Sequence, residues 1–98
     1  MTARVYIQNV IIRISQEDLM LTDYIDAALH HATYKIIEDG SYWGEIPALP
    51  GLWGSGSTLE ACREDLGDVV QDWLIFAFKQ DRTIPIINGI DLNATAAV

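Results

Sequence analysis

The segment from Tyr42 to Leu59 constrains the fold more than any other part of this chain. It contains Pro47 and Pro50, which lack a backbone N–H and have a fixed φ, so this backbone can form a strand edge or a corner but not a central strand. Three glycines between positions 51 and 56 permit tight bends that side chains would obstruct. The segment therefore predicts short strands joined by rigid corners, and Glu45 is its only obvious candidate for a catalytic group.

The composition predicts one acidic domain. With 98 residues, of which 50% are hydrophobic, the chain is long enough to bury one core and too short for two, so we expect a single domain over residues 1–98. Its net charge of -8 opposes the attraction to phosphates that drives most nucleic-acid binding, so direct binding of DNA or RNA by this chain alone is disfavoured. The same charge suits a basic protein partner, and solubility alone also explains it.

The cysteine count and the apolar runs suggest a compartment. Cys62 is the single cysteine, which excludes an internal disulfide and a multi-cysteine zinc site and fits a reducing environment. The amino terminus lacks the basic-then-apolar pattern of a signal peptide, and the longest apolar run, Trp73 to Phe78, is too short to span a bilayer. We therefore expect a cytoplasmic protein. Met1 and Met20 are both candidate start sites.

The first 31 residues predict a strand followed by a helix. Val5 to Ile14 is rich in β-branched residues and alternates as a strand does, although the phase of the alternation changes within it. A helix at about 17–31 follows from apolar residues at helical spacing. Its expected buried residues are Leu21, Tyr24, Ile25, Ala28 and Ala32.

Three short strands are expected next. Residues 32–37 and 41–46 should pair across the turn formed by Asp39 and Gly40, which is a strong hairpin signal. After the proline corner, residues 51–55 should return as a third antiparallel strand.

A long amphipathic helix then begins at Ser57 or Thr58, with Glu60 placed to complete a capping box with Ser57. Spacings of three and four predict its buried stripe: Leu59, Cys62, Leu66, Val69, Val70, Trp73, Leu74 and Ala77. Residues 84–92 form a last extended segment, which could add an edge strand or pair with a second subunit. Residues 93–98 are expected to fray.

Together these elements predict an α+β fold in which a small, mainly antiparallel sheet of three or four strands packs on one long helix. Residues 32–92 would form the core of the domain, with residues 1–31 as a strand-helix extension. We expect a homodimer or higher homo-oligomer, because so small a sheet leaves its edges to be covered.

From Tyr34 onward the chain resembles the HicB-like antitoxin family of toxin-antitoxin systems. The residues that carry the resemblance are Glu45-Ile46-Pro47-Ala48-Leu49-Pro50-Gly51, Gly56-Ser57-Thr58-Leu59-Glu60, Leu66, Trp73-Leu74 and Ile84-Pro85. The resemblance covers about the middle half of the chain. It departs from the family where Ala61-Cys62 replaces the usual Glu-Ala, and only a short apolar segment follows Pro85 where many HicB proteins carry a DNA-binding domain.

The resemblance implies a partial ribonuclease-H-like fold and a function in binding rather than catalysis. Proteins of this family neutralise HicA, a small basic ribonuclease toxin, and an acidic chain suits such a partner. We expect no cofactor for this chain. Two other functions stay open. One is a stand-alone oligomeric protein of the same fold without a toxin, and the other is a degenerate metal-dependent nuclease.

Two groups of residues are candidates for contacting a partner. Trp43, Glu45 and Trp53 flank the proline corner, where aromatic residues beside a strand edge make good interface anchors, although core packing is the common alternative for tryptophan on a sheet. An acidic ridge recurs every four residues along the long helix and would either face solvent or dock a basic partner. It consists of Glu60, Glu64, Asp68 and Asp72.

Other reactive residues are better explained by structure. His30 and His31 are adjacent on a helix and point about 100° apart, so they cannot hold one metal in regular geometry. Cys62 lies in the apolar stripe, where a small buried hydrophobe is the better interpretation. Glu38, Asp39 and Glu45 gather only around a turn and a strand, which argues against a nuclease site. No catalytic or metal-binding residue is therefore assigned.

Overall fold

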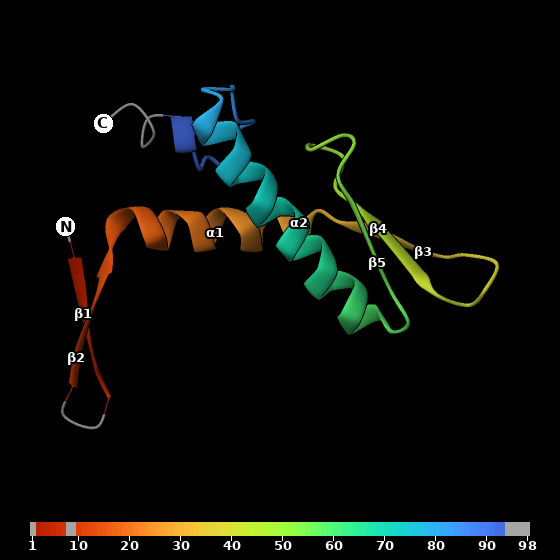
Figure 1. Ribbon diagram of the computed structural model, residues 1–98, viewed down its shortest axis with the longest axis horizontal. Helices are drawn as coiled ribbons and strands as arrows, with labels where there is room; N and C mark the ends of the chain where they lie inside the picture. Colours follow the sequence, from red (N-terminus) through yellow and green to blue (C-terminus); the bar gives the residue numbers. More distant parts are fainter. Residues whose placement is uncertain (1, 8–9, 94–98) are drawn as a thin grey trace.

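The computed structural model describes the backbone of residues 2–7 and 10–93 and the side chains of residues 20–93. The elements in chain order are β1 (Thr2–Ile7), β2 (Val10–Ser15), α1 (Gln16–His30), β3 (Thr33–Ile36), β4 (Tyr42–Glu45), β5 (Trp53–Gly56) and α2 (Leu59–Lys79). The predicted α+β class is confirmed, since a three-stranded antiparallel sheet packs against the long helix α2 (Figure 1).

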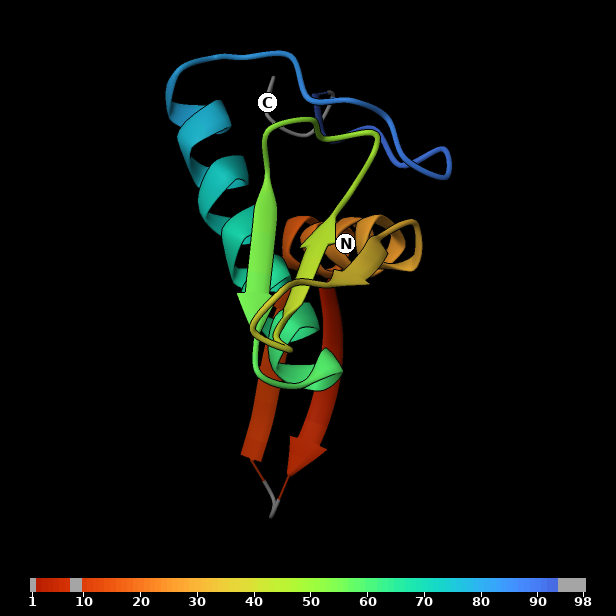
Figure 2. The same ribbon diagram turned by 90° about the vertical axis from the view of Figure 1, so that its right-hand side faces the viewer.

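The central sheet has the strand order β3-β4-β5, and each neighbouring pair is antiparallel (Figure 2). Gly44 on β4 stands opposite Tyr34 on β3 and Gly54 on β5. The turn between β3 and β4 is the predicted one: Gly40 has a φ of 85°, and its N–H donates to the carbonyl of Ile37 at 2.9 Å. All three predicted strands are thus present, each within two residues of its expected bounds.

Glycines on β5 bring the strand backbone into contact with the backbone of α2. A Cβ atom added to Gly54 would lie 2.6 Å from the amide nitrogen of Leu66, and one added to Gly56 would lie 2.5 Å from that of Cys62. Real Cβ atoms do not approach backbone so closely, so only glycine fits at these positions. Gly44 faces the same side, with the Tyr34 ring and the Cys62 sulfur as its nearest neighbours. The helix therefore lies on the face of the sheet that these glycines form.

The start of α2 differs from the expected capping box. Thr58 is the N-cap, and its hydroxyl accepts a hydrogen bond from the amide of Ala61 at 3.0 Å. Because Thr58 rather than Ser57 caps the helix, the third helical position is Ala61 and Glu60 cannot complete the box. Leu59, expected in the buried stripe, is 46% exposed because it lies in the first turn, at the end of the helix.

The core lies between α2, α1 and the segments that follow β4 and α2. Helix α1 contributes Tyr24, Ala27, Ala28 and Leu29, so it is part of the core and residue 31 does not divide extension from core. The Tyr24 hydroxyl donates to the carbonyl of Pro85 at 2.6 Å and joins α1 to the carboxy-terminal segment. The other buried apolar residues of the cluster are Ile46, Leu49, Leu66, Val70, Leu74, Ala77, Ile84, Ile87 and Leu92.

The segment after α2 is not the edge strand that its isoleucines suggested. Its only pairing within the described residues is an isolated bridge between Ile87 and Ile90 around a turn. It crosses the core instead, and Asn93 fastens its end: the Asn93 side chain accepts from the Ile84 N–H at 2.8 Å and donates to the Ile84 carbonyl at 2.7 Å. Asn93 was expected in the frayed tail, whose remaining residues, 94–98, lie outside the described part of the chain.

The amino-terminal strand was predicted as one element and is two. β1 and β2 form an antiparallel hairpin in which Ile7 pairs with Val10, and residues 8–9 lie outside the described chain. The alternation within residues 5–14 changes phase between Ile7 and Val10, where one strand ends and the next begins, so the prediction of a single strand was wrong. α1 follows β2 directly, close to the predicted bounds. The hairpin extends away from the central sheet, from the far end of α1 (Figure 1).

Candidate protein-binding site

The sheet face opposite α2 carries the predicted aromatic residues. Side chains alternate between the two faces along a strand, and Gly44 and Gly54 face the helix. Trp43, Glu45 and Trp53 must therefore point to the other face. The register places Glu45 opposite Trp53, so the two tryptophans occupy diagonal positions on neighbouring strands. We call these three residues the tryptophan face.

The two tryptophans stack on one another. Their ring centroids are 4.2 Å apart, and the ring planes are inclined by 9°. The indole N–H of Trp43 donates to the Glu45 carboxylate at 3.0 Å, and the Lys35 ammonium lies 5.9 Å from the centroid of the Trp43 ring. Trp53 is 49% exposed. The structure thus decides against core packing for Trp53. The two stacked rings form a flat aromatic surface on which the Trp43 indole N–H is already hydrogen-bonded.

Such a surface suits protein recognition. Tryptophan offers a large contact area that loses little conformational freedom on binding, and clustered aromatic anchors dominate many interfaces. Stacking fixes both rings before a partner arrives, which lowers the entropic cost of association. Glu45 fixes the Trp43 ring in orientation and adds one charge to the rim of the surface.

The acidic ridge lies elsewhere on the molecule. Glu60, Glu64, Asp68 and Asp72 are all exposed, as solvated ridge residues should be. With 100° between successive residues, their positions on α2 are centred opposite the buried stripe that contacts the sheet. The ridge therefore faces away from the sheet on the α2 side, and the tryptophan face lies on the other side. The structure does not join the two predicted groups into one surface.

Comparison with known proteins identifies the family of this chain. The model of the UPF0150-like family matches residues 23–85, which include α1 from its middle, the central sheet and all of α2. The chain belongs to the UPF0150-like family. The crystal structure of TTHA0281 from Thermus thermophilus is similar to this fold, with a TM-score of 0.68 and 37% sequence identity. The match covers 74% of this chain and 90% of TTHA0281. No curated protein matched.

Every predicted contact residue falls inside the segment matched by the UPF0150-like model, whereas the β1-β2 hairpin falls outside it. The matched segment also contains most of the region from Tyr34 onward that resembles HicB-like antitoxins. Membership of this family agrees with a small antitoxin-like protein, and the match names no toxin.

One acidic residue that the sequence analysis did not single out has a structural role in this UPF0150-like domain. The Asp65 carboxylate accepts a hydrogen bond from the Ser55 N–H at 2.9 Å, which satisfies a backbone donor on the outer edge of β5. The only sequence signal was a carboxylate near the helix start, ten residues after a strand position. Asp65 therefore helps α2 to close this edge of the sheet, while β3 forms the other edge.

Cys62 is a buried structural residue of the domain, as predicted. Its side chain is fully buried and its thiol lies 3.6 Å from the Gly54 carbonyl. Burial, reinforced by the negative charge of Asp65, raises the pKa of the Cys62 thiol above its ordinary value. A thiol held protonated is a poor nucleophile, so Cys62 is no candidate for covalent chemistry.

The carboxylates near the β3-β4 turn do not converge. The Asp39 carboxylate accepts two hydrogen bonds from Ser41, from its hydroxyl and its amide, which lower the pKa of Asp39. Glu45 is bound to Trp43. Among residues 20–93, no three histidine, cysteine or acidic side chains are arranged to hold a metal ion.

The two adjacent histidines, His30 at the end of α1 and His31 just after it, have separate hydrogen-bond partners. His30 is hydrogen-bonded to the Asp26 carbonyl at 2.8 Å, and His31 to the Asn88 side chain at 2.9 Å.

Across the described chain, no helix combines the length and apolarity that crossing a bilayer requires.

Proposed function

We propose that this protein is an antitoxin that binds and neutralises a small basic ribonuclease toxin of the HicA type, without catalysis of its own. The resemblance to HicB-like antitoxins and membership of the UPF0150-like family support this proposal. The acidic chain suits a basic partner, since complementary charge favours encounter and suppresses wrong partners.

The observation that carries the proposal is the stacked pair of Trp43 and Trp53 on the sheet face that α2 leaves free. Exposed tryptophan on a sheet is costly in water, and a fixed aromatic pair with a hydrogen-bonded rim is typical of an interface core. We assign the tryptophan face as the surface that contacts the toxin.

The acidic ridge has a different part in this proposal. Because it faces away from the tryptophan face, one small toxin molecule cannot cover both surfaces at once. Exposed charges outside an interface act mainly on the association rate, through a field that salt screens. Glu60, Glu64, Asp68 and Asp72 should therefore accelerate the approach of a basic toxin and contribute little to the lifetime of the complex.

Self-association without a toxin is the second candidate function, and one observation favours it. Ile36 is 65% exposed on β3, which forms an edge of the sheet. Such an edge can pair with the same strand of another copy. Under this alternative the chain would form stable oligomers and would protect cells from no toxic protein.

Co-expression separates the two candidates. Where a neighbouring reading frame encodes a small basic protein, that protein is expressed alone and together with this chain, and growth is measured. Neutralisation predicts that the basic protein stops growth, that the wild-type chain restores it, and that the double variant Trp43→Ala/Trp53→Ala does not.

Ile86→Ala is the matched control, because Ile86 is also an exposed apolar residue, at 59%, but lies outside the sheet. It should restore growth as the wild type does. Persistent toxicity in the presence of the soluble wild-type chain would overturn the proposal.

A further inference from the structure

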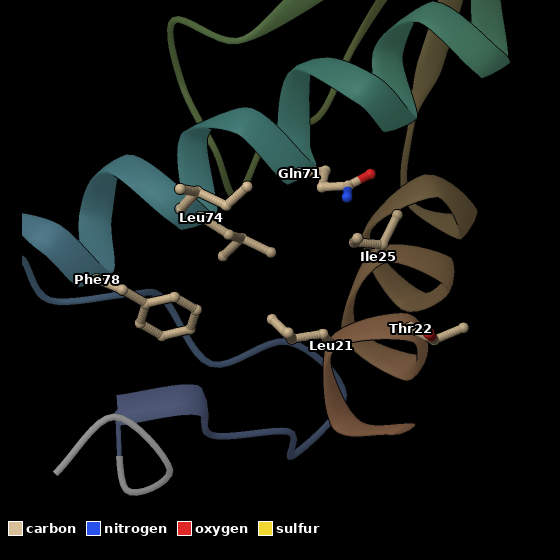
Figure 3. Close-up of a pocket in the computed structure, with 7 residues that line it drawn as sticks. Leu21, Thr22, Ile25, Gln71, Leu74 and Phe78 are labelled. Carbon is tan, nitrogen blue, oxygen red and sulfur yellow. The ribbon is translucent and has the colours of Figure 1, made fainter. Parts of the chain in front are cut away.

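A groove runs between α1 and the carboxy-terminal half of α2 (Figure 3). It shares no residue with the tryptophan face. Its volume is about 310 Å³. Apolar side chains from both helices form its walls, and Ile75 at its margin is 47% exposed. The lining residues are Leu21, Thr22, Ile25, Gln71, Leu74, Ile75 and Phe78.

The walls of the groove favour a helix as its occupant. Both walls are α-helices, whose backbone N–H and C=O groups are already paired within each helix. An extended strand in the groove would bury its own backbone groups without partners, which is costly, whereas a helix satisfies its own backbone. From Gln71 to Phe78 the α2 wall is about 10 Å long, which matches two turns of a docked helix.

The charges beside the groove favour a basic occupant. Residues three and four apart are neighbours on a helix surface, so Asp68 lies beside Gln71, and Asp72 lies beside Ile75. On the other wall, Asp26 lies one turn from Thr22. All three aspartates are exposed, and Lys79, one turn beyond Ile75, is the cation that adjoins the α2 wall. A cationic helix would therefore meet opposite charge along most of the groove.

We propose that this groove binds a basic amphipathic helix of a partner protein. Apolar residues on one face of that helix, spaced by three, four and seven, fill the space between Leu21, Ile25 and Phe78. Lysine or arginine residues flanking that face lie against Asp68 and Asp72. Two members of the acidic ridge thus border a binding surface. This site is independent of the tryptophan face and of the toxin proposed above.

A synthetic peptide tests the proposal directly. The probe is an amphipathic helical peptide with leucine at spacings of three and four and lysine elsewhere, and its matched control has glutamate in place of each lysine. Calorimetric titration into the full chain should show binding of the lysine peptide and at least tenfold weaker binding of the glutamate peptide. Equal affinity for both peptides would overturn the proposal.

Protein variants locate the site. Ile75→Asp should weaken binding of the lysine peptide at least tenfold, and Ile86→Asp, at an exposed apolar residue away from the groove, should leave it unchanged. The double variant Asp68→Lys/Asp72→Lys should reduce both the affinity and its dependence on salt. Circular dichroism checks that each variant is folded.

Two outcomes would contradict the assignment. One is equal binding of the lysine peptide by the folded Ile75→Asp variant and the wild type. The other is that the wild-type chain forms a dimer that does not bind the peptide, and that Ile75→Asp converts this dimer to a monomer. A second copy of this chain would then occupy the groove.

Discussion

The backbone of Gly54 lies so close to the backbone of Leu66 that no side chain fits between β5 and α2. This contact decides which face of the sheet the helix covers. Because side chains alternate along a strand, the glycine face belongs to α2 and the tryptophans are left on the free face. The sequence suggested that these glycines form bends. In the structure they let α2 pack against one face of the sheet, which leaves the tryptophan face uncovered.

Substitution of Gly54 by alanine should destabilise the fold. The added Cβ would lie 2.8 Å from the Leu66 Cα and must push strand and helix apart, at a cost of about 1–3 kcal/mol. Gly67→Ala is the matched control, since its added Cβ would meet only the Leu29 side chain at 3.5 Å. In a helix interior, that change should add roughly 0.5–1 kcal/mol of stability. Urea unfolding measures both, and equal effects would contradict the close packing.

The N-cap assignment makes a second prediction. Thr58→Ala removes the hydroxyl that accepts from Ala61 and should lower the free energy of unfolding by about 1 kcal/mol. Ser57→Ala alters the neighbouring hydroxyl, which is not the cap, and should change stability by less than about 0.5 kcal/mol. A larger loss of stability at Ser57 than at Thr58 would contradict the Thr58 cap and favour the Ser57 capping box expected from the sequence.

The middle of the fold could be predicted because local signals there agree with the tertiary structure. The Asp39-Gly40 turn, the prolines and the apolar spacing of α2 each specify a conformation within a few residues. The carboxy-terminal segment has isoleucines typical of a strand, and it is buried in the core without joining the sheet. Its structure depends on distant residues, such as Tyr24, which no local pattern reveals.

The clamp between Asn93 and Ile84 should stabilise that segment. Asn93→Ala removes both hydrogen bonds to the Ile84 backbone and leaves partly buried groups unpaired, at a cost of about 1–3 kcal/mol. Asn88→Gly is the control, because Asn88 has a φ of 50° that glycine adopts readily, and its side chain bonds only at the surface. That change should stay within about 0.5 kcal/mol in thermal unfolding, and equal losses for both variants would contradict the clamp.

Tyr24 should make stability depend on alkaline pH. Burial raises the pKa of the Tyr24 hydroxyl from 10.0 to about 12, because the fold favours its neutral form. The contribution of Tyr24 to the free energy of unfolding is fully present below pH 10, the pKa of tyrosine in the unfolded chain. It is lost as pH rises from 10 to about 12. Tyr24→Phe should flatten stability over this window in denaturant unfolding at successive pH values. An unchanged slope would contradict the raised pKa.

The site was only partly predictable, for a geometric reason. Sequence spacing showed that Glu64 and Asp68 share a helix face and that Trp43 and Trp53 flank a corner. Which side of the sheet each group faces depends on the strand register and on the glycine contacts with α2, and these are tertiary properties. The indole hydrogen bond to Glu45 and the edge contact of Asp65 depend on the same packing.

The stacked geometry of Trp43 and Trp53 should be visible in solution. Two indoles at 4.2 Å couple their electronic transitions and should give an exciton couplet in far-ultraviolet circular dichroism. Trp53→Phe should abolish the couplet, because it removes one of the coupled indoles. Trp73→Phe should preserve it, since Trp73 packs beside the core on α2. Loss of the couplet in the Trp73 variant alone would contradict the stack.

The affinity of the purified chain for a HicA-type basic toxin, taken from a neighbouring reading frame that encodes one, tests the central claim most directly. Trp53→Ala should raise the Kd at least tenfold, equivalent to about 1.4 kcal/mol, mainly through faster dissociation. Ile86→Ala should leave the Kd unchanged, and reversing Glu64 and Asp68 to lysine should chiefly slow association at low salt. An unchanged Kd for folded Trp53→Ala would contradict the assignment of the tryptophan face.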